Sequence, residues 1–269
     1  CYICIDGAEV PIMDGSSKFF IKAIEDAKIV EQNALREEFF PAEMITYECE
    51  DSGSKISIIP DEKYSIDTKV NYKTKVLGIQ SATLNNISDF KDEISSARTF
   101  SFLHELETLL ENGLIKGGDL NNAIVYVDKP LADSNMDRLK KAFNKDSISV
   151  KENGILDNLS LHYPNEAARH KLLDIIGDLA LIGMKIRGKV VAEKPGHSIN
   201  AKFAQKVSEV IKSDRKNILP KLNFDKKPLM DSNQIMDVIP HRPPFLLIDE
   251  VLELSLSLIH ISEPTRHTD

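Results

Sequence analysis

The chain has 269 residues, of which 42% are hydrophobic and 28% charged, and its formal net charge is −8. This composition is typical of a globular protein with enough apolar residues for one or two cores. The acidic balance argues against nucleic acid or an anionic membrane surface as the main partner. No apolar run approaches the roughly 20 residues of a membrane span, and no signal peptide is recognisable. The 3 cysteines are too few for a disulfide framework, which suits a reducing cytoplasm.

The N-terminal residues predict a strand, a turn and a helix. Residues 1–5 form a short apolar run typical of a strand, a turn follows at 14–15, and 17–27 predict a helix. Cys1 and Cys4 form a C-x-x-C pair, which can be a redox pair or half of a zinc site. Because strand positions three apart face opposite sides, we expect the two thiols to diverge and to have no functional role.

The middle of the chain mixes strands and helices. Residues 45–77 alternate between apolar and polar side chains, which predicts short strands, with 51–54 forming a hairpin turn. Residues 100–110 predict a helix that Gly113 ends. Residues 123–127 predict a buried strand. Together these elements predict an α+β fold.

The most informative segment is residues 165–183, which predict a helix capped by Asn165. Each step of four residues advances about 40° around a helix, so His170, Asp174 and Asp178 share one face. An imidazole and a carboxylate at this spacing can hold one cation, although such a pair alone is more often a surface hydrogen bond. Two more elements follow, a strand through residues 190–191 and a helix over 200–212.

Four ordered blocks resemble those of one enzyme family. One block is R-H-K-L-L-D-I-I-G-D-L from Arg169, followed after a strand by P-G-H-S-I-N from Pro195. It closely resembles UDP-3-O-acyl-N-acetylglucosamine deacetylase, the zinc-dependent amidase of lipid A synthesis. Residues 11–16, 97–102 and 114–118 are similar to the family's P-I-x-D-G-S, A-R-T-F-x-F and L-x-x-G-G. The resemblance implies a two-domain α+β sandwich with helix layers packed between sheets, and we expect most of the first domain to be missing here.

The resemblance also implies a metal site and a catalytic pair. His170 and Asp174 would be two of the three protein ligands of Zn²⁺, which activates water for amide hydrolysis. Asp178 would hold the imidazole of His197 in position and favour its protonated form. His197 would then stabilise the oxyanion or protonate the leaving amine.

Two groups of the family have no counterpart in this chain. Its third zinc-binding histidine and its general-base glutamate precede the point where the chain starts, so we expect the natural sequence to continue before Cys1. His104, His162 and His241 are poor substitutes for that ligand. We therefore expect the 269-residue chain to bind zinc weakly and not to deacetylate.

The same resemblance implies where a UDP-linked acylated glucosamine would bind. Thr99 and Phe100 would face this substrate. Lys171 would contact the substrate or the oxyanion, and a solvated lysine is an equally good interpretation. The passage for the acyl chain would be lined by Leu103, Leu106, Ile115, Gly118 and Val125. Without the resemblance, an ordinary core would be the better interpretation of these apolar residues.

The C-terminal part predicts a second enzyme. Residues 229–254 resemble the start of a β-hydroxyacyl-acyl-carrier-protein dehydratase, which would make acyl carrier protein a further partner. In that family the segment around His241 is structural and the catalytic motifs lie further downstream, so we expect this piece to be inert. Residues 255–269 resemble no protein element and look like a sequencing adapter translated in frame.

The sequence predicts five parts and allows three functional hypotheses. The expected parts are the end of a first deacetylase domain (1–40), a second deacetylase domain (41–223), a linker (224–228), the start of the dehydratase (229–254) and a non-native tail (255–269). The chain would be a fragment of a zinc deacetylase fused to this dehydratase. The alternatives are a dehydratase with the front portion as its fusion partner, and a catalytically dead paralogue that binds lipid or a partner protein.

Overall fold

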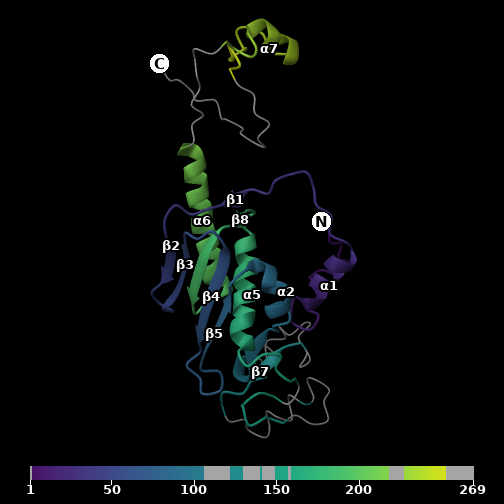
Figure 1. The fold of residues 1–269 in the computed structure, drawn as a ribbon, viewed down its shortest axis with the longest axis vertical. Coiled ribbons are helices and arrows are strands. Elements are labelled where there is room, and N and C mark those ends of the chain that lie inside the picture. Colours follow the sequence, from purple (N-terminus) through teal and green to yellow (C-terminus); the bar gives the residue numbers. More distant parts are fainter. Residues whose placement is uncertain are drawn as a thin grey trace. The chain divides into compact units, whose positions relative to one another are not determined.

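A computed structural model describes residues 2–105, 122–129, 140, 149–156, 159–217 and 227–252. The chain divides into two compact units, Cys1–Lys212 and Ser213–Asp269, and each is described by itself. Helices and strands are mixed along the chain, which confirms the predicted α+β class (Figure 1).

The first unit contains nearly all of the regular structure. Its elements in chain order are α1 (Lys18–Asp26), β1 (Glu38–Phe39), β2 (Ile45–Cys49), β3 (Ser54–Ile59), β4 (Tyr64–Asn71), β5 (Ile79–Leu84), the 3-10 helix η1 (Ile87–Asp89), α2 (Phe90–Glu93), β6 (Phe100–Phe102), β7 (Ile124–Tyr126), α5 (Glu166–Ala180), β8 (Lys185–Ile186), β9 (Gly188–Glu193) and α6 (His197–Asn217), whose last residues lie beyond Lys212.

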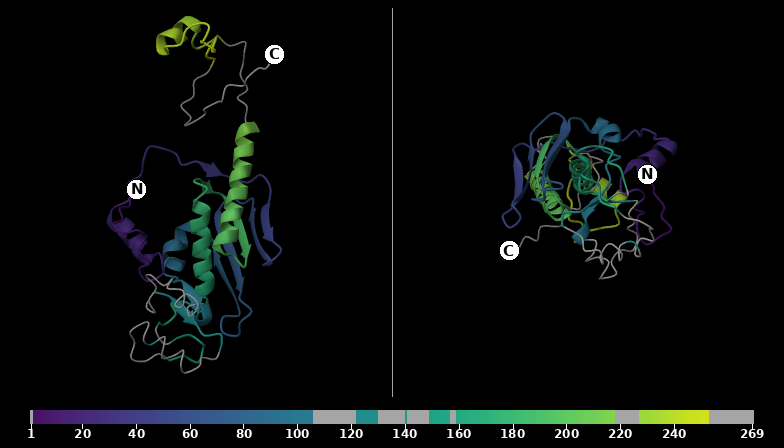
Figure 2. Two further views of the ribbon diagram at one scale, coloured as in Figure 1. Left: turned by 180° about the vertical axis from the view of Figure 1, so that it is seen from behind. Right: turned by 90° about the horizontal axis from the view of Figure 1, so that it is seen from below.

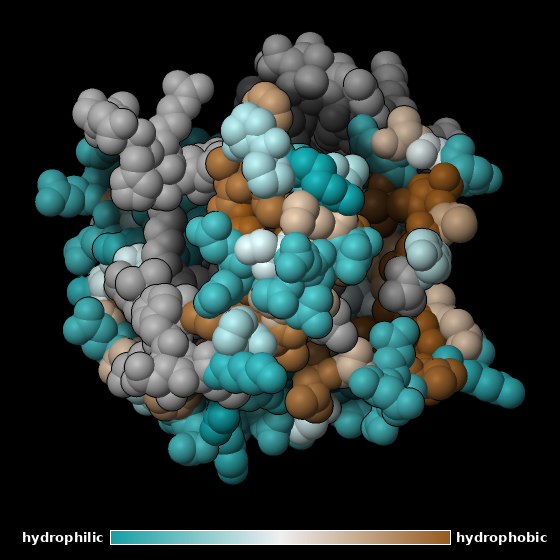
Figure 3. All heavy atoms as spheres, turned by 90° about the horizontal axis from the view of Figure 1, so that it is seen from above, coloured by the Kyte–Doolittle hydropathy of each residue, from teal (hydrophilic) through white to brown (hydrophobic). Residues whose placement is uncertain are grey.

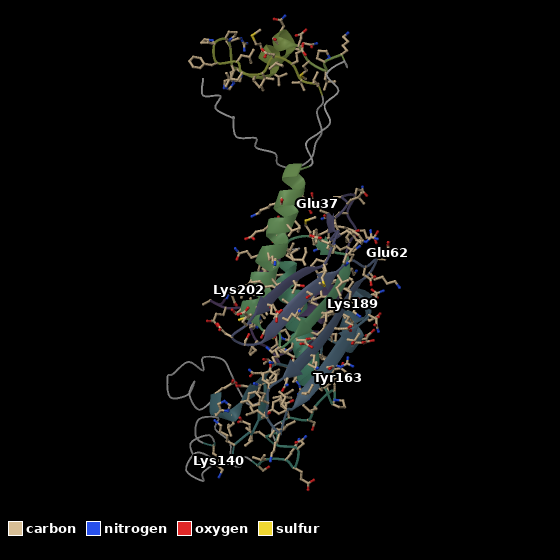
Figure 4. The ribbon with its side chains drawn as sticks, turned by 90° about the vertical axis from the view of Figure 1, so that its left-hand side faces the viewer. Glu37, Glu62, Lys140, Tyr163, Lys189 and Lys202 are labelled. Atoms are coloured by element: carbon tan, nitrogen blue, oxygen red, sulfur yellow. The ribbon has the colours of Figure 1, made fainter. Side chains whose placement is uncertain are left out.

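A five-stranded sheet with the order β2-β3-β9-β4-β5 is the centre of this unit. β4 and β9 run parallel, and the other neighbours are antiparallel. Because side chains alternate along a strand, one face collects Ile56, Ile58 and Ile66, each at most 1% exposed. The other face is charged, and Lys189 Nζ lies 2.7 Å from Asp67 Oδ2 on it (Figure 4).

Helices α5 and α6 cover the apolar face of the sheet. Leu172 and Ile175 of α5 and Phe203 of α6 are completely buried, in one cluster with the strand residues. Figure 2 shows both helices on the same side of the sheet. Burying such a side chain contributes roughly 1.5–3 kcal/mol, so these contacts hold α5 firmly while another of its faces remains available for polar residues.

The helix predicted over residues 100–110 begins later than expected. Phe100–Phe102 is the strand β6, which pairs in parallel with β7, and the helix begins at Leu103. Because alternate strand residues share a face, both phenylalanine rings point to one side, where they pack against Tyr72 and Tyr126. Strand pairing and this aromatic cluster outweigh the helical pattern. The part of the predicted helix beyond residue 105 lies outside the described residues.

The strand predicted over residues 1–5 is also wrong in the part that the structure describes. Residues 2–5 pair with no described strand, and Tyr2 and Ile3 are exposed. An apolar run forms a strand only where a neighbour accepts and donates its backbone hydrogen bonds. Cys4 is an exposed free thiol, and Cys1 lies outside the described residues.

The other predicted elements of the first unit are confirmed within a few residues. They are α1, the strands β2 to β4 with their hairpin turn, β7, α5 and β9. Other differences remain. The last helix, α6, begins at His197 instead of near residue 200 and continues to Asn217. The short elements β1, β5, η1, α2 and β8 were not predicted.

Several large hydrophobic side chains lie at the surface between hydrophilic ones (Figure 3). Phe19 of α1 is one of them, and α1 buries none of its residues. No helix in the described ranges is long and apolar enough to cross a membrane.

The second unit contains the short helix α7 (Ser232–Val238), which begins with a capping box between Asp231 and Gln234. An isolated bridge joins Met230 to Val251. The predicted linker and tail lie mostly or entirely outside the described residues, and the predicted domain boundaries stay predictions.

Candidate active site

One face of α5 carries three of the predicted site residues. His170 and Asp174 are 8% and 7% exposed, and the side chain of Asp178 is 19% exposed. The helix begins after Asn165 as predicted, but the Asn165 side chain does not cap it. Its oxygen accepts a hydrogen bond from Arg169 Nε, and its amide nitrogen donates to the carbonyl of Ser81 in β5. This side chain therefore fixes α5 to the sheet.

Two lone pairs converge between His170 and Asp174. The Nδ1 atom of His170 lies 3.1 Å from the carbonyl oxygen of Ala97. A carbonyl only accepts, so Nδ1 carries the hydrogen and Nε2 of the neutral ring presents a lone pair. Burial lowers the pKa of His170 despite the opposing charge of Asp174, which keeps the ring neutral at pH 7. Nε2 then faces Oδ1 of Asp174 at 3.4 Å, acceptor against acceptor.

This separation fits a shared metal ion. Ligand distances of 2.0–2.2 Å and a tetrahedral angle place the nitrogen and oxygen ligands of zinc about 3.4 Å apart. The hydrogen bond from Nδ1 to a backbone carbonyl is also the usual support of a metal-binding histidine. Within the ranges that the structure describes, no group of three or more His, Cys, Asp and Glu side chains could hold a metal. His170 and Asp174 thus offer two protein ligands where a catalytic zinc site uses three.

His197, the first residue of α6, lies close to the carboxylates of both Asp178 and Asp174. Its Nδ1 lies 3.0 Å from Oδ2 of Asp178, which also accepts a hydrogen bond from Asn200 Nδ2 at 2.9 Å. Its Nε2 lies 3.9 Å from Oδ2 of Asp174, and the side chain is 72% exposed. The structure therefore places His197 beside Asp178, as expected, with Nε2 directed toward the His170–Asp174 pair. The catalytic roles of His197 and Asp178 stay predictions.

Lys171 and Phe100 also lie beside His170 and Asp174. Lys171 Nζ lies 2.8 Å from Oδ2 of Asp174 and 5.5 Å from the centre of the Phe100 ring. The lysine side chain is only 18% exposed, which does not fit the solvated lysine considered above. Phe100 also packs edge-on against the His170 imidazole, with 6.4 Å between ring centres. The aromatic ring thus contacts two of the polar groups that the sequence assigned to chemistry.

Thr99 is held by the N-terminal block. Its amide donates to the Gly15 carbonyl at 2.7 Å, and its own carbonyl accepts from the Ile124 amide at 2.9 Å. Gly15 has φ +81°, and a Cβ atom there would lie 2.0 Å from the Asn122 carbonyl oxygen, so only glycine fits. Two sequence blocks that are more than 80 residues apart therefore meet beside β7.

The remaining predicted site residues are only partly among the described residues. Gly118 lies outside the described residues, as do Leu106 and Ile115. Leu103 and Val125 are buried at 3% and 1% exposure. Their role in an acyl passage stays a prediction.

Sequence reasoning missed three supporting groups. Asn200 follows His197 by three residues, a spacing that places both on one helix face and could have indicated the contact with Asp178. The Ala97 carbonyl gives no sequence signal, because any residue has a carbonyl. Arg98 lies inside the block at 97–102, and Glu166 lies just before the block that starts at Arg169, but no local pattern pairs residues so far apart in the chain.

The chain matches the family described as UDP-3-O-acyl N-acetylglycosamine deacetylase (LpxC) over residues 1–145 and 134–209. These matches cover well over half of the chain, and they include the residues of the site. The chain belongs to this deacetylase family.

Curated relatives agree with the family match. The chain is 42% identical to the "Bifunctional enzyme LpxC/FabZ" of Porphyromonas gingivalis, over 94% of the chain and 55% of the relative. It is 40% identical to the protein of the same name from Bacteroides thetaiotaomicron, over 96% of the chain and 56% of the relative. A "UDP-3-O-acyl-N-acetylglucosamine deacetylase" of Syntrophotalea carbinolica is 33% identical over 77% of the chain and 59% of the relative. The chain thus spans about half the length of the curated relatives it matches.

Proposed function

We propose that this chain is part of a zinc-dependent amidase that removes the acetyl group from UDP-3-O-acyl-N-acetylglucosamine in lipid A biosynthesis. The observation that supports zinc most directly is the 3.4 Å approach of His170 Nε2 to Asp174 Oδ1, with the hydrogen of His170 held on Nδ1 by the Ala97 carbonyl. Two unshared acceptors this close together repel unless a cation or a proton lies between them.

In this proposal, zinc and the residues of the chain have different roles in amide hydrolysis. Zinc, when bound, activates a water molecule and polarises the amide carbonyl. His197 presents Nε2 to the reacting amide and protonates the leaving amine or stabilises the oxyanion, while Asp178 fixes its ring through Nδ1. Lys171 supplies positive charge next to Asp174. Thr99 and Phe100 contact the substrate.

We propose that the third ligand and the general base come from a segment that precedes Cys1, as the family resemblance implies. We also propose that residues 229–254 begin a 3-hydroxyacyl-acyl-carrier-protein dehydratase, for which acyl carrier protein would be the partner. Cysteine usage favours the cytoplasm as the compartment for both activities.

The test uses the full-length gene product that contains this chain. We expect it to bind one zinc ion per active site and to release acetate from UDP-3-O-acyl-N-acetylglucosamine. Metal content is measured by atomic spectroscopy and acetate by a coupled assay, before and after removal of the metal by a chelator. Turnover that survives removal of the metal would contradict the proposal.

A further inference from the structure

A buried ion pair lies one helical turn before the candidate metal ligands. Arg98 is 5% exposed, and Glu166 is completely buried. The guanidinium donates from Nε to Glu166 Oε1 at 2.8 Å and from Nη2 to Oε2 at 3.2 Å. Nη2 also donates to the carbonyl of Ser160 at 2.6 Å, and Oε2 accepts from the amide of His162 at 2.6 Å. Both charges are therefore surrounded by partners.

One peptide unit connects this ion pair to the candidate metal site. The amide of Arg98 donates to Oε1 of Glu166 at 3.1 Å, and the carbonyl of the same peptide bond, that of Ala97, accepts from His170 Nδ1 at 3.1 Å. A trans peptide is planar, and its N–H and C=O point in opposite directions. Glu166 and His170 are one turn apart on α5, so this single rigid plane bridges two successive turns of the helix.

Further contacts hold the same loop in place. Tyr163, labelled in Figure 4, shares a hydrogen bond of 2.9 Å with the hydroxyl of Ser96. The ring of His162 donates from Nδ1 to the Ser96 carbonyl at 2.9 Å. Each of these contacts acts on the residue next to Ala97. The direction of the Ala97 carbonyl is therefore determined by the segment before α5 and by Glu166 at its start.

We propose that Arg98 and Glu166 are positioning residues for metal binding, because they orient the peptide whose carbonyl fixes the ring and the tautomer of His170. The hydrogen bonds that the two side chains make in the described part of the chain go to each other, to the Ser160 carbonyl and to the amides of Arg98 and His162, and not to His170 or Asp174. The inference rests on the proposed function only in taking His170 as a metal ligand. Orientation of the His170 ring by this peptide can be measured without any metal.

The experiment compares four variants of the full-length gene product. Glu166→Ala removes the acceptor of the Arg98 amide, and Glu166→Gln keeps one carbonyl oxygen as the conservative variant. His170→Ala removes the ligand. Ile56→Ala creates a cavity in β3, on the sheet and away from this loop, and serves as a control for general destabilisation. Zinc affinity is measured by competition with a chelator, and the tautomer of His170 by ¹⁵N NMR of the metal-free protein.

We expect Glu166→Ala to weaken zinc binding by roughly 10- to 100-fold, the range known for groups that orient metal ligands, and to change the His170 tautomer population. Glu166→Gln is expected to restore part of the affinity, and Ile56→Ala to leave affinity and tautomer unchanged. Unchanged affinity and tautomer in folded Glu166→Ala would overturn the inference, as would an equal loss of affinity in Ile56→Ala.

The outcomes separate this inference from the proposed function. If His170→Ala still binds zinc stoichiometrically, the assignment of the ligand fails, whatever the Glu166 variants do. If His170→Ala loses zinc while the Glu166 variants retain full affinity and the wild-type tautomer, only the positioning role fails. Should Glu166→Ala not fold, Glu166→Gln alone decides through the same two measurements.

Discussion

Helix α5 carries two buried carboxylates with very different surroundings. Glu166 accepts four hydrogen bonds, three from Arg98 and one from the His162 amide. Asp174, two turns later, accepts one from Lys171 and faces the lone pair of His170 Nε2. Since burial of an unsatisfied charge is costly, the saturated carboxylate suits a scaffold and the unsaturated one suits a ligand. Equal burial therefore does not mean equal function.

Removing the ligand histidine is the strongest test of this contrast. His170→Ala is expected to abolish stoichiometric zinc binding and turnover of the full-length gene product, because Asp174 and the proposed third ligand are only two of the three protein ligands that a catalytic zinc site uses. Metal analysis after gel filtration and the acetate assay check both effects. A variant that keeps its zinc would mean that the His170–Asp174 pair is not the metal site.

Removing His197 is expected to affect chemistry and not metal. His197→Ala is predicted to lower kcat by about 10²–10⁴, the usual contribution of general acid–base catalysis, while zinc content stays at the wild-type level. The reverse pattern, with zinc lost and kcat per bound zinc retained, would exchange the roles of His197 and His170. Asn200→Ala serves as a milder companion, because it removes only the second hydrogen bond to Asp178.

At the Arg98–Glu166 ion pair, near the start of α5, the expected effect is on stability. Arg98→Met leaves Glu166 charged and buried without its partner, which typically costs about 3–5 kcal/mol. Urea unfolding followed by circular dichroism measures the change in the free energy of unfolding. Asp174→Asn, which neutralises the second carboxylate itself, is expected to cost less, since Asp174 has only one hydrogen bond to lose. Equal losses would remove the contrast between the two carboxylates.

Acid is expected to weaken the Arg98–Glu166 ion pair selectively. Burial raises the pKa of Glu166, but the hydrogen bonds and charge of Arg98 outweigh it and bring that pKa below its ordinary value. A lowered folded-state pKa means that this stabilisation is complete above the unfolded value of about 4.3 and disappears as the pH falls through the folded value. The difference in unfolding free energy between wild type and Glu166→Gln is therefore predicted to shrink as the pH is lowered below about 4. A difference independent of pH would argue that Glu166 is not ionised in the folded protein.

The smallest effect is expected on the outer face of the sheet. The Lys189–Asp67 ion pair is close, at 2.7 Å, but both side chains are more than a third exposed. Exposed pairs contribute about 0–1 kcal/mol, so Lys189→Ala is predicted to change the free energy of unfolding by no more than that. A larger loss in the same urea experiment would show that charge at the surface, and not burial, dominates this fold.

Local periodicity predicted what lies on one element, and tertiary contacts decided the rest. The four-residue spacing of His170, Asp174 and Asp178 placed them correctly on one helix face. The same reasoning gave Asn165 as the cap of α5, but its side chain bonds to Arg169 and to β5 instead.

Contacts distant in sequence escaped prediction for a physical reason. Phe100 and Phe102 form a strand because β7 and Tyr72 lie beside them, and a helical pattern in the following residues cannot report that. The peptide between Ala97 and Arg98 acts through backbone atoms, which every residue has. The resemblance to the deacetylase family indicated that this block matters, but only the structure connects it to His170.

The most direct test of the metal site proposed at His170 and Asp174 is ¹⁵N NMR of histidine-labelled full-length protein, before and after addition of one equivalent of zinc. At pH 7 without metal, we predict that His170 is neutral, with its hydrogen on Nδ1 and the lone pair on Nε2. Zinc is then predicted to shift the Nε2 resonance while Nδ1 keeps its hydrogen. A hydrogen on Nε2 in the metal-free protein, or a His170 spectrum that zinc leaves unchanged, would contradict this account.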